Sequence, residues 1–173
     1  MKQQGLWHTG WRAVTLISCF VVLLVIAAIL PVPAFDRPLS TVVLAEDGRL
    51  LGAHIADDGQ WRFPPGKSLN KKYSTALIHY EDRCFYGHPG VNPVALVRSL
   101  YLNLRQGEIV SGGSTISMQL ARMSGGNPPR TVPRKVLEMM MALKLELFHS
   151  KDEILAMYAS NAPFGGNVVG IDA

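Results

Sequence analysis

Hydrophobic positions in this sequence form one continuous block near the start and periodic patterns after it. Residues 13–30 make up eighteen consecutive positions without a charged side chain. An α-helix of that length spans about 27 Å, close to the hydrocarbon thickness of a bilayer. Two tryptophans precede the block and Pro31 follows it, as at the interface and the end of a membrane helix. The pattern predicts a transmembrane anchor over residues 13–32.

Residues 33–67 have the pattern of a linker followed by a small β region. Strands are predicted at 41–45, 50–55 and 60–63, because each is a short run rich in apolar or aromatic side chains. Asp-Gly turns separate the three runs. We therefore expect a small antiparallel meander of three strands.

From residue 68 to residue 173 the period becomes helical. Leu69, Tyr73, Leu77 and Tyr80 share one face of the first helix. Capping signals, among them an Asn-Pro start and a Ser-x-x-Glu box, predict the later helices. These helices are expected over 92–105, 114–123, 131–149 and 150–158. The predicted fold is mainly α, preceded by the transmembrane helix and the β meander.

Composition and charge narrow the class of protein. Hydrophobic residues make up 48% of the chain and charged residues 17%, which excludes a disordered chain. The net charge is +4, and two of the basic residues precede the apolar block, so we expect no nucleic-acid partner. The two cysteines exclude a disulfide scaffold and a four-cysteine zinc site.

The charges beside the apolar block predict its orientation. Lys2 and Arg12 precede the block, and no net charge follows it closely. The positive-inside rule then places residues 1–12 in the cytoplasm and residues 35–173 outside, which in a bacterium is the outer face of the inner membrane. A cleaved signal peptide is the alternative. The block exceeds the usual length of about 7–15 residues and no small-x-small cleavage site follows, so the anchor is favoured.

The first chemical motif covers residues 81–91. Leu77 lies one helical turn before Glu81, and Phe85 lies one turn after it if the helix continues. Apolar neighbours favour a carboxylate that takes up a proton readily, as a general base must. The alternative is a solvated cluster of charged residues at a helix end.

The second motif is a glycine loop before a helix. Gly112 and Gly113 precede Ser114 and Thr115, and Gln119 follows one turn later. Free N–H groups at a helix start attract anions, and these polar side chains add donors suited to phosphate or sugar oxygens. The alternative is a plain glycine loop with a Ser/Thr cap.

The third motif pairs two charges on a helix. Arg134 and Glu138 are four residues apart, on the face that Met141, Ala142 and Leu145 continue. Charges on an otherwise apolar face are predicted to point inward. The alternative is an ordinary surface pair.

Two broader patterns complete the sequence. Residues 151–166 predict an amphipathic helix closed by a glycine turn, a structural pattern when taken alone. Between residues 98 and 135 there are six basic residues and one acidic residue. This bias suits an anionic ligand such as a pyrophosphate or lipid headgroups, with a solvated basic face as the alternative.

Together and in this order, the four motifs resemble the glycosyltransferase domain of the class A penicillin-binding proteins, most closely its 1C branch. This is the peptidoglycan glycosyltransferase family that polymerises lipid II. The likeness covers about residues 39–173. It implies a lysozyme-like helical lobe with a smaller, membrane-dipping jaw. Because the chain stops at Ala173, inside the expected domain, we expect the lobe to be incomplete.

The resemblance also implies roles for single residues. Glu81 would be the general base that takes the proton from the 4-hydroxyl of the acceptor GlcNAc. Inverting attack on the MurNAc carbon would then release undecaprenyl pyrophosphate. Glu138 would be the second essential carboxylate, orienting pyrophosphate-binding groups or a divalent cation (Mg²⁺ or Mn²⁺), the one cofactor that the family suggests. The implied substrate-binding residues are Asp82, Arg83, His88, Gly113, Ser114, Thr115, Gln119, Arg122, Arg134 and Lys135.

The partners implied are lipid II, undecaprenyl-linked glycan, the membrane and a peptidoglycan synthesis complex. Two other hypotheses stay open at this point. A non-catalytic anchored module would bind lipid II or a divisome partner without turnover. A lysozyme-like glycan hydrolase could also use Glu81, but it would need neither a membrane anchor nor pyrophosphate-binding cations.

Overall fold

The structure is a computed structural model that describes residues 14, 15, 18, 25, 29, 32–66 and 69–173. The chain divides into two compact units, Met1–Val32 and Pro33–Ala173. Most of the predicted anchor at residues 13–32 lies outside the described residues. Within the residues described, no helix is both long enough and apolar enough to cross a bilayer.

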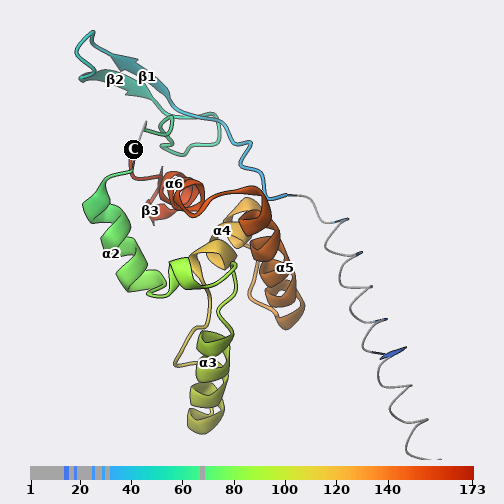
Figure 1. Ribbon diagram of the computed structural model, residues 1–173. Helices are drawn as coiled ribbons and strands as arrows, with labels where there is room; N and C mark the ends of the chain where they lie inside the picture. The colour runs from blue at the N-terminus through green and yellow to red at the C-terminus, as the bar shows by residue number, and fades with distance from the viewer. Residues whose placement is uncertain (1–13, 16–17, 19–24, 26–28, 30–31, 67–68) are drawn as a thin grey trace, which may run out of the picture. The chain divides into compact units, whose positions relative to one another are not determined.

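A β-hairpin opens the second unit (Figure 1). Strand β1 (Thr41–Leu44) pairs antiparallel with β2 (Leu50–His54). Gly48 in the connecting turn has a φ of 81°, a left-handed conformation that glycine adopts without steric cost. The first two predicted strands are therefore confirmed.

The predicted meander is wrong at its third strand. Residues 60–63 do not continue the hairpin; the backbone of Trp61 instead hydrogen-bonds Asn167 and Val169 near the C-terminal end. The neighbouring Arg62 is only 4% exposed, and its guanidinium donates to the Pro38 carbonyl and the Asp58 carboxylate. The backbone of Arg62 pairs with Ser40, so Trp61 and Arg62 are held by the linker and by the C-terminal segment and not by β2.

The helical part contains five α-helices among the described residues, and its predicted helices are confirmed with shifts of a few residues. They begin where the sequence supplies caps: Asn70, Asn92, Thr115 and Ser150 each accept a backbone hydrogen bond at a helix start. The helices are α2 (Lys71–Glu81), α3 (Pro93–Gln106), α4 (Ile116–Ser124), α5 (Val132–Phe148) and α6 (Lys151–Asn161).

The core is built around α4, which packs against both α5 and α6 (Figure 1). Ile116, Met118 and Leu120 of α4 are fully buried. A short 3-10 helix, η1 (Phe85–Gly87), inserts Phe85 into the same core. The core residues are Leu77, Phe85, Ile116, Leu120, Ala121, Met123, Leu145, Ile154, Leu155, Tyr158 and Ala162.

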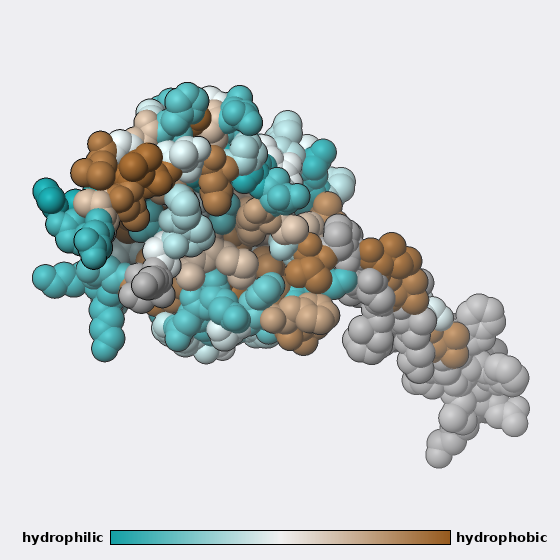
Figure 2. All heavy atoms as spheres, turned by 90° about the horizontal axis from the view of Figure 1, so that it is seen from above, coloured by the Kyte–Doolittle hydropathy of each residue, from teal (hydrophilic) through white to brown (hydrophobic). Residues whose placement is uncertain are grey.

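Helix α3 extends away from this core (Figure 1) and buries only Ser99. Its exposed side includes Val94, Val97, Leu100, Tyr101 and Leu104, each at least 60% exposed. Elsewhere apolar side chains gather in separate groups among hydrophilic ones, as the face in Figure 2 shows. An apolar surface of this size on one helix suits contact with lipid or with another protein.

After α6 the chain forms a second small hairpin, where the sequence pattern predicts only a glycine turn. Strand β3 (Pro163–Gly165) pairs antiparallel with β4 (Val168–Val169). Gly170 then adopts a φ of 88°, and a Cβ there would lie 2.6 Å from the Ser160 carbonyl oxygen. Only glycine fits so close an approach to α6.

Candidate active site

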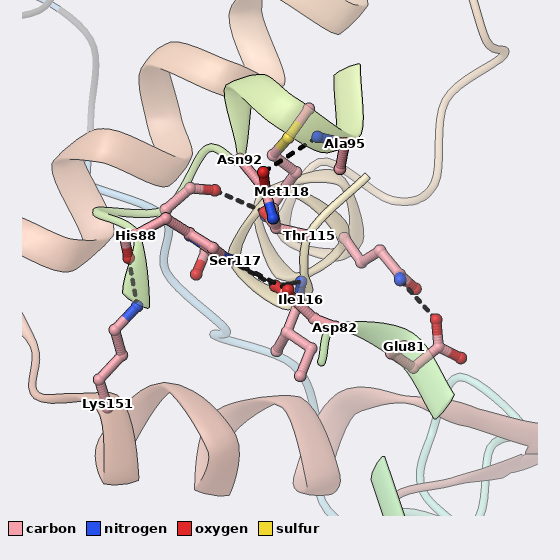
Figure 3. Close-up of polar contacts among 12 residues, drawn as sticks. Glu81, Asp82, His88, Asn92, Ala95, Thr115, Ile116, Ser117, Met118 and Lys151 are labelled. Carbon is pink, nitrogen blue, oxygen red and sulfur yellow. Dashed lines mark hydrogen bonds and ion pairs between the residues drawn. The ribbon is translucent and has the colours of Figure 1, made fainter. Parts of the chain in front are cut away.

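Glu81 is the last residue of α2, and its side chain is half-buried. One carboxylate oxygen, Oε2, accepts a hydrogen bond of 2.7 Å from the Gln119 amide on α4 (Figure 3). No residue that the structure describes donates to the other oxygen, Oε1. The helix ends at Glu81, so Phe85 lies in η1 and not on the next turn of α2. The carboxylate is thus held on one side and left available on the other.

Behind Gln119 lies Tyr158 of α6, which is 6% exposed. Its hydroxyl donates to Oε1 of Gln119 at 3.2 Å. Burial, and next the negative charge of Glu81, raise the pKa of Tyr158 to about 12, while Arg122 acts in the opposite direction. The phenol therefore remains protonated at physiological pH.

The neighbouring carboxylate, Asp82, turns into the protein (Figure 3). It is 7% exposed and accepts from the His88 ring at 3.0 Å and from the Ile116 backbone N–H at 3.3 Å. That N–H belongs to the first turn of α4, where a negative charge is favourable. Asp82 and His88, predicted to bind substrate, thus lie behind the Glu81 carboxylate and connect the end of α2 to the start of α4.

A second charged cluster joins the loop before α4 to the first turn of α5. The Lys135 ammonium donates to Ser114 Oγ at 2.5 Å and to Glu138 at 3.1 Å. The Glu138 side chain is 12% exposed and the Lys135 side chain 34% exposed. The prediction that Glu138 points inward is confirmed. Its partner, however, is Lys135 at i−3.

Arg134, predicted to share the inward face with Glu138, is exposed. Its side chain makes no ion pair with the residues that the structure describes. Spacings of three and four residues both bring side chains to one helix face. The position of Ser114 on the opposing loop selects Lys135 for the inward place.

The loop around Gly113 packs directly on α3. A Cβ at Gly113 would lie 2.8 Å from Ser99 Oγ and 2.9 Å from Leu96 Cα. Asn103 of α3 holds the chain just before it, donating to the Ser111 carbonyl and accepting from the Val110 N–H. The glycine predicted for a ligand therefore also serves a close helix–loop contact.

Thr115 caps α4 and donates through its hydroxyl to the Gly90 carbonyl (Figure 3). Gly90 has a φ of 90°, and a Cβ there would meet the Ala142 carbonyl of α5 at 2.7 Å. Thr115 is 2% exposed, so its contribution is to hold the loop between Glu81 and α3 in place.

A further buried network was not predicted from the sequence. Glu146 of α5 accepts from Ser117 at 2.6 Å and from Lys151 at 2.8 Å. Lys151 also donates to the His88 carbonyl and lies 4.3 Å from the centre of the Phe85 ring. Glu146 is eight residues after Glu138, on the same face of α5, and that spacing was the available signal.

Two predicted cations lie at the margins of the site. Arg83 is exposed, and its guanidinium donates to the His79 carbonyl one turn earlier. Arg122 is half-buried on α4 and close enough to Tyr158 to lower its pKa. The site thus has a carboxylate at Glu81 and cationic groups at Lys135 and Arg122, all positioned by α4 or its preceding loop.

The divalent cation that the family suggests does not fit the described residues. No group of three or more His, Cys, Asp or Glu side chains is arranged there to hold a metal ion. Asp82 is paired with His88, and Glu138 with Lys135.

Comparison with known proteins identifies the class to which this fold and site belong. Residues 47–173 match the transglycosylase family, which covers most of the chain. The chain belongs to the transglycosylase family. The matched segment includes all the site residues described above.

Among curated proteins, the chain is similar to several penicillin-binding proteins. It is 42% identical to penicillin-binding protein 1C of Escherichia coli over 144 residues, which cover 83% of this chain and 19% of that protein. It is 36% identical to penicillin-binding protein 1B of Haemophilus influenzae over 133 residues, covering 75% of this chain and 17% of that protein. The chain thus spans about a fifth or less of the length of these relatives.

Proposed function

We propose that this chain is the glycosyl-transferring part of a membrane-bound enzyme of cell wall synthesis, which polymerises lipid II into glycan strands. The observation that carries the proposal is the Glu81 carboxylate, held by Gln119 on one oxygen and available on the other, in a chain of the transglycosylase family. Transfer inverts the anomeric carbon of MurNAc and releases undecaprenyl pyrophosphate.

In this mechanism Glu81 is the general base. Its Oε1 accepts the proton of the acceptor 4-hydroxyl, and the sugar oxygen then attacks the anomeric carbon of the donor. The 2.7 Å hydrogen bond from Gln119 fixes the carboxylate, so that no conformational freedom has to be lost as the acceptor approaches.

Lys135, held by Ser114 and Glu138, supplies positive charge for the departing pyrophosphate. Lys135 is the cation best placed to stabilise negative charge that develops on the leaving group, because its ammonium is held by Ser114 and Glu138 and remains a third exposed. Glu138 keeps this ammonium in position. Arg122 and the more exposed Arg134 add positive charge along the same part of the chain.

A lipid-linked substrate requires the enzyme to work at a membrane surface. The apolar face of α3, which follows the Glu81 loop, suits contact with the bilayer. The predicted anchor at residues 13–32 would keep the domain there, with residues 1–12 in the cytoplasm and the site on the outer face of a bacterial inner membrane. A peptidoglycan synthesis complex is the partner proposed for it.

The decisive experiment is gel-resolved polymerisation of labelled lipid II in detergent, with and without moenomycin, using the protein as its gene encodes it. We expect moenomycin-sensitive glycan strands, and their loss in Glu81→Gln. Glu46→Gln, a change in the exposed hairpin turn, is the matched control and should polymerise normally. Equal polymerisation by the Glu81→Gln and Glu46→Gln variants would overturn the assignment of the base.

A further inference from the structure

We infer that Tyr158 is a positioning residue that orients the general base Glu81 through Gln119. Tyr158 donates a hydrogen bond to Gln119, and Gln119 donates one to Glu81; we call this chain of two hydrogen bonds the relay. This inference rests on the proposed role of Glu81 and extends it to α6, a helix whose sequence pattern alone indicates a structural role. The relay crosses three helices: Glu81 ends α2, Gln119 lies on α4 and Tyr158 on α6.

The two hydrogen bonds of the relay use opposite ends of one amide. Tyr158 donates its hydroxyl proton to Gln119 Oε1 at 3.2 Å, and Gln119 Nε2 donates to Glu81 Oε2 at 2.7 Å. An ionised carboxylate only accepts hydrogen bonds. Gln119 therefore supports Glu81 only while its NH₂ group, and not its oxygen, faces the carboxylate.

The Tyr158 hydroxyl selects that orientation. The Gln119 oxygen accepts from the Tyr158 hydroxyl only in the orientation that turns the NH₂ group toward Glu81. Turning the amide over would place Oε1 against the carboxylate and Nε2 against the phenol, leaving two acceptors in contact. Without the hydroxyl, the amide loses the partner of its oxygen and can rotate with less cost.

The position of Tyr158 makes its donor permanent. The residue is 6% exposed, within a core that includes Ile154 and Leu155 of the same helix. Because burial and the Glu81 charge raise its pKa to about 12, the phenol does not ionise over the pH range in which the enzyme would work. A hydroxyl that is always protonated holds the amide in one direction at all these pH values.

Tyr73, which lies on α2 like Glu81, provides a matched control. It is also partly buried, and burial, followed by the negative charge of Glu81, raises the pKa of its phenol. Its ring packs against Phe164 at 6.4 Å between centroids. Among the described residues its hydroxyl has no hydrogen-bond partner, so Tyr73→Phe removes a hydroxyl near Glu81 without breaking the relay.

The test compares Tyr158→Phe with Tyr73→Phe in the lipid II assay across pH. Tyr158→Phe should lower kcat about tenfold with KM within about twofold. The acid limb of its rate profile should move toward alkaline pH, because a carboxylate whose donor is less firmly held is protonated more readily. Tyr73→Phe should leave both unchanged.

A double-mutant cycle separates the relay from packing. If Tyr158 acts through Gln119, adding Tyr158→Phe to Gln119→Ala should cost no further activity. A further tenfold loss in the double variant would overturn the relay, as would an unchanged pH profile in Tyr158→Phe. Circular dichroism spectra and thermal melting confirm that each variant is folded.

One readout does not depend on turnover. The side-chain carboxyl signal of Glu81 can be followed in ¹³C NMR during a pH titration and assigned by its loss in Glu81→Gln. The midpoint of this titration should move toward alkaline pH in Tyr158→Phe and stay in place in Tyr73→Phe. Equal midpoints in the wild-type protein and both variants would overturn the relay. Absence of polymerisation by the wild-type protein would overturn the proposed function alone.

Discussion

The carboxylate of Asp82 lies 3.3 Å from the backbone nitrogen of Ile116 and so joins the residue after α2 to the first turn of α4. The same carboxylate accepts from His88. Glu81 and Gln119 lie on the two elements that this contact joins. The buried carboxylate therefore helps to set the distance between the general base and its donor.

Replacing Asp82 should destabilise the fold. Asp82→Ala leaves the His88 ring and a helix N-terminal N–H without their acceptor in a buried place, which typically costs about 2–4 kcal/mol. Denaturant unfolding measures this cost. Asp57→Ala, at an exposed turn, should change the free energy of unfolding by less than about 0.5 kcal/mol. Equal effects of the two changes would contradict the contact described.

Gly90 should tolerate no side chain. In Gly90→Ala the new Cβ would lie 2.7 Å from the Ala142 carbonyl, at a φ of 90°. Conformational strain and overpacking together should cost about 2–4 kcal/mol in unfolding experiments. Gly107→Ala separates the two effects: its φ is 73° with no atom within 4 Å, so it should cost only about 1 kcal/mol.

Lys135 should matter more for the rate than for substrate binding. Lys135→Met keeps most of the side-chain volume but removes the ammonium held by Ser114 and Glu138. We expect kcat for lipid II polymerisation to fall about 100-fold or more, since charge stabilisation of this kind acts in the transition state. Lys72→Met, an exposed lysine of α2, is the control. A KM effect without a change in kcat would contradict the leaving-group role.

Alkaline pH should weaken the fold through Tyr158. Its pKa is raised from 10.0 to about 12 in the folded state, so the neutral phenol contributes stability fully below pH 10. That contribution, about 2 kcal/mol at most, is lost as the pH rises from about 10 to about 12. Unfolding titrations should show this loss in the wild-type protein and in Tyr80→Phe, an exposed tyrosine, but not in Tyr158→Phe.

Most of the helical part could be predicted from the sequence because helix caps are local signals. The asparagine cap before Pro93 starts α3 as expected, and the left-handed Gly107 ends it. The Ser150–Glu153 box starts α6. Each signal acts within one turn of a helix, so it is visible in the sequence alone. The inward direction of Glu138 followed in the same way from the apolar face of α5.

The features that the sequence could not predict depend on contacts between residues far apart along the chain. The backbone of Trp61 hydrogen-bonds Asn167 and Val169, more than a hundred positions later, and no local pattern indicates such pairing. Lys135 replaces Arg134 beside Glu138 because Ser114 lies opposite it. The relay behind Glu81 depends on the meeting of α2, α4 and α6, so the pattern of residues 151–166 alone gives Tyr158 no role in the site.

The separation of these partners along the chain sets the order in which the site can form. Gln119 lies 38 residues after Glu81, and Tyr158 lies 39 residues after Gln119. At about 5–20 residues per second, synthesis takes roughly 4–15 seconds to proceed from the base to the end of its relay. Glu81 is therefore the first carboxylate of the site to be made, and its hydrogen-bonded surroundings are complete only once α6 has been synthesised and has packed.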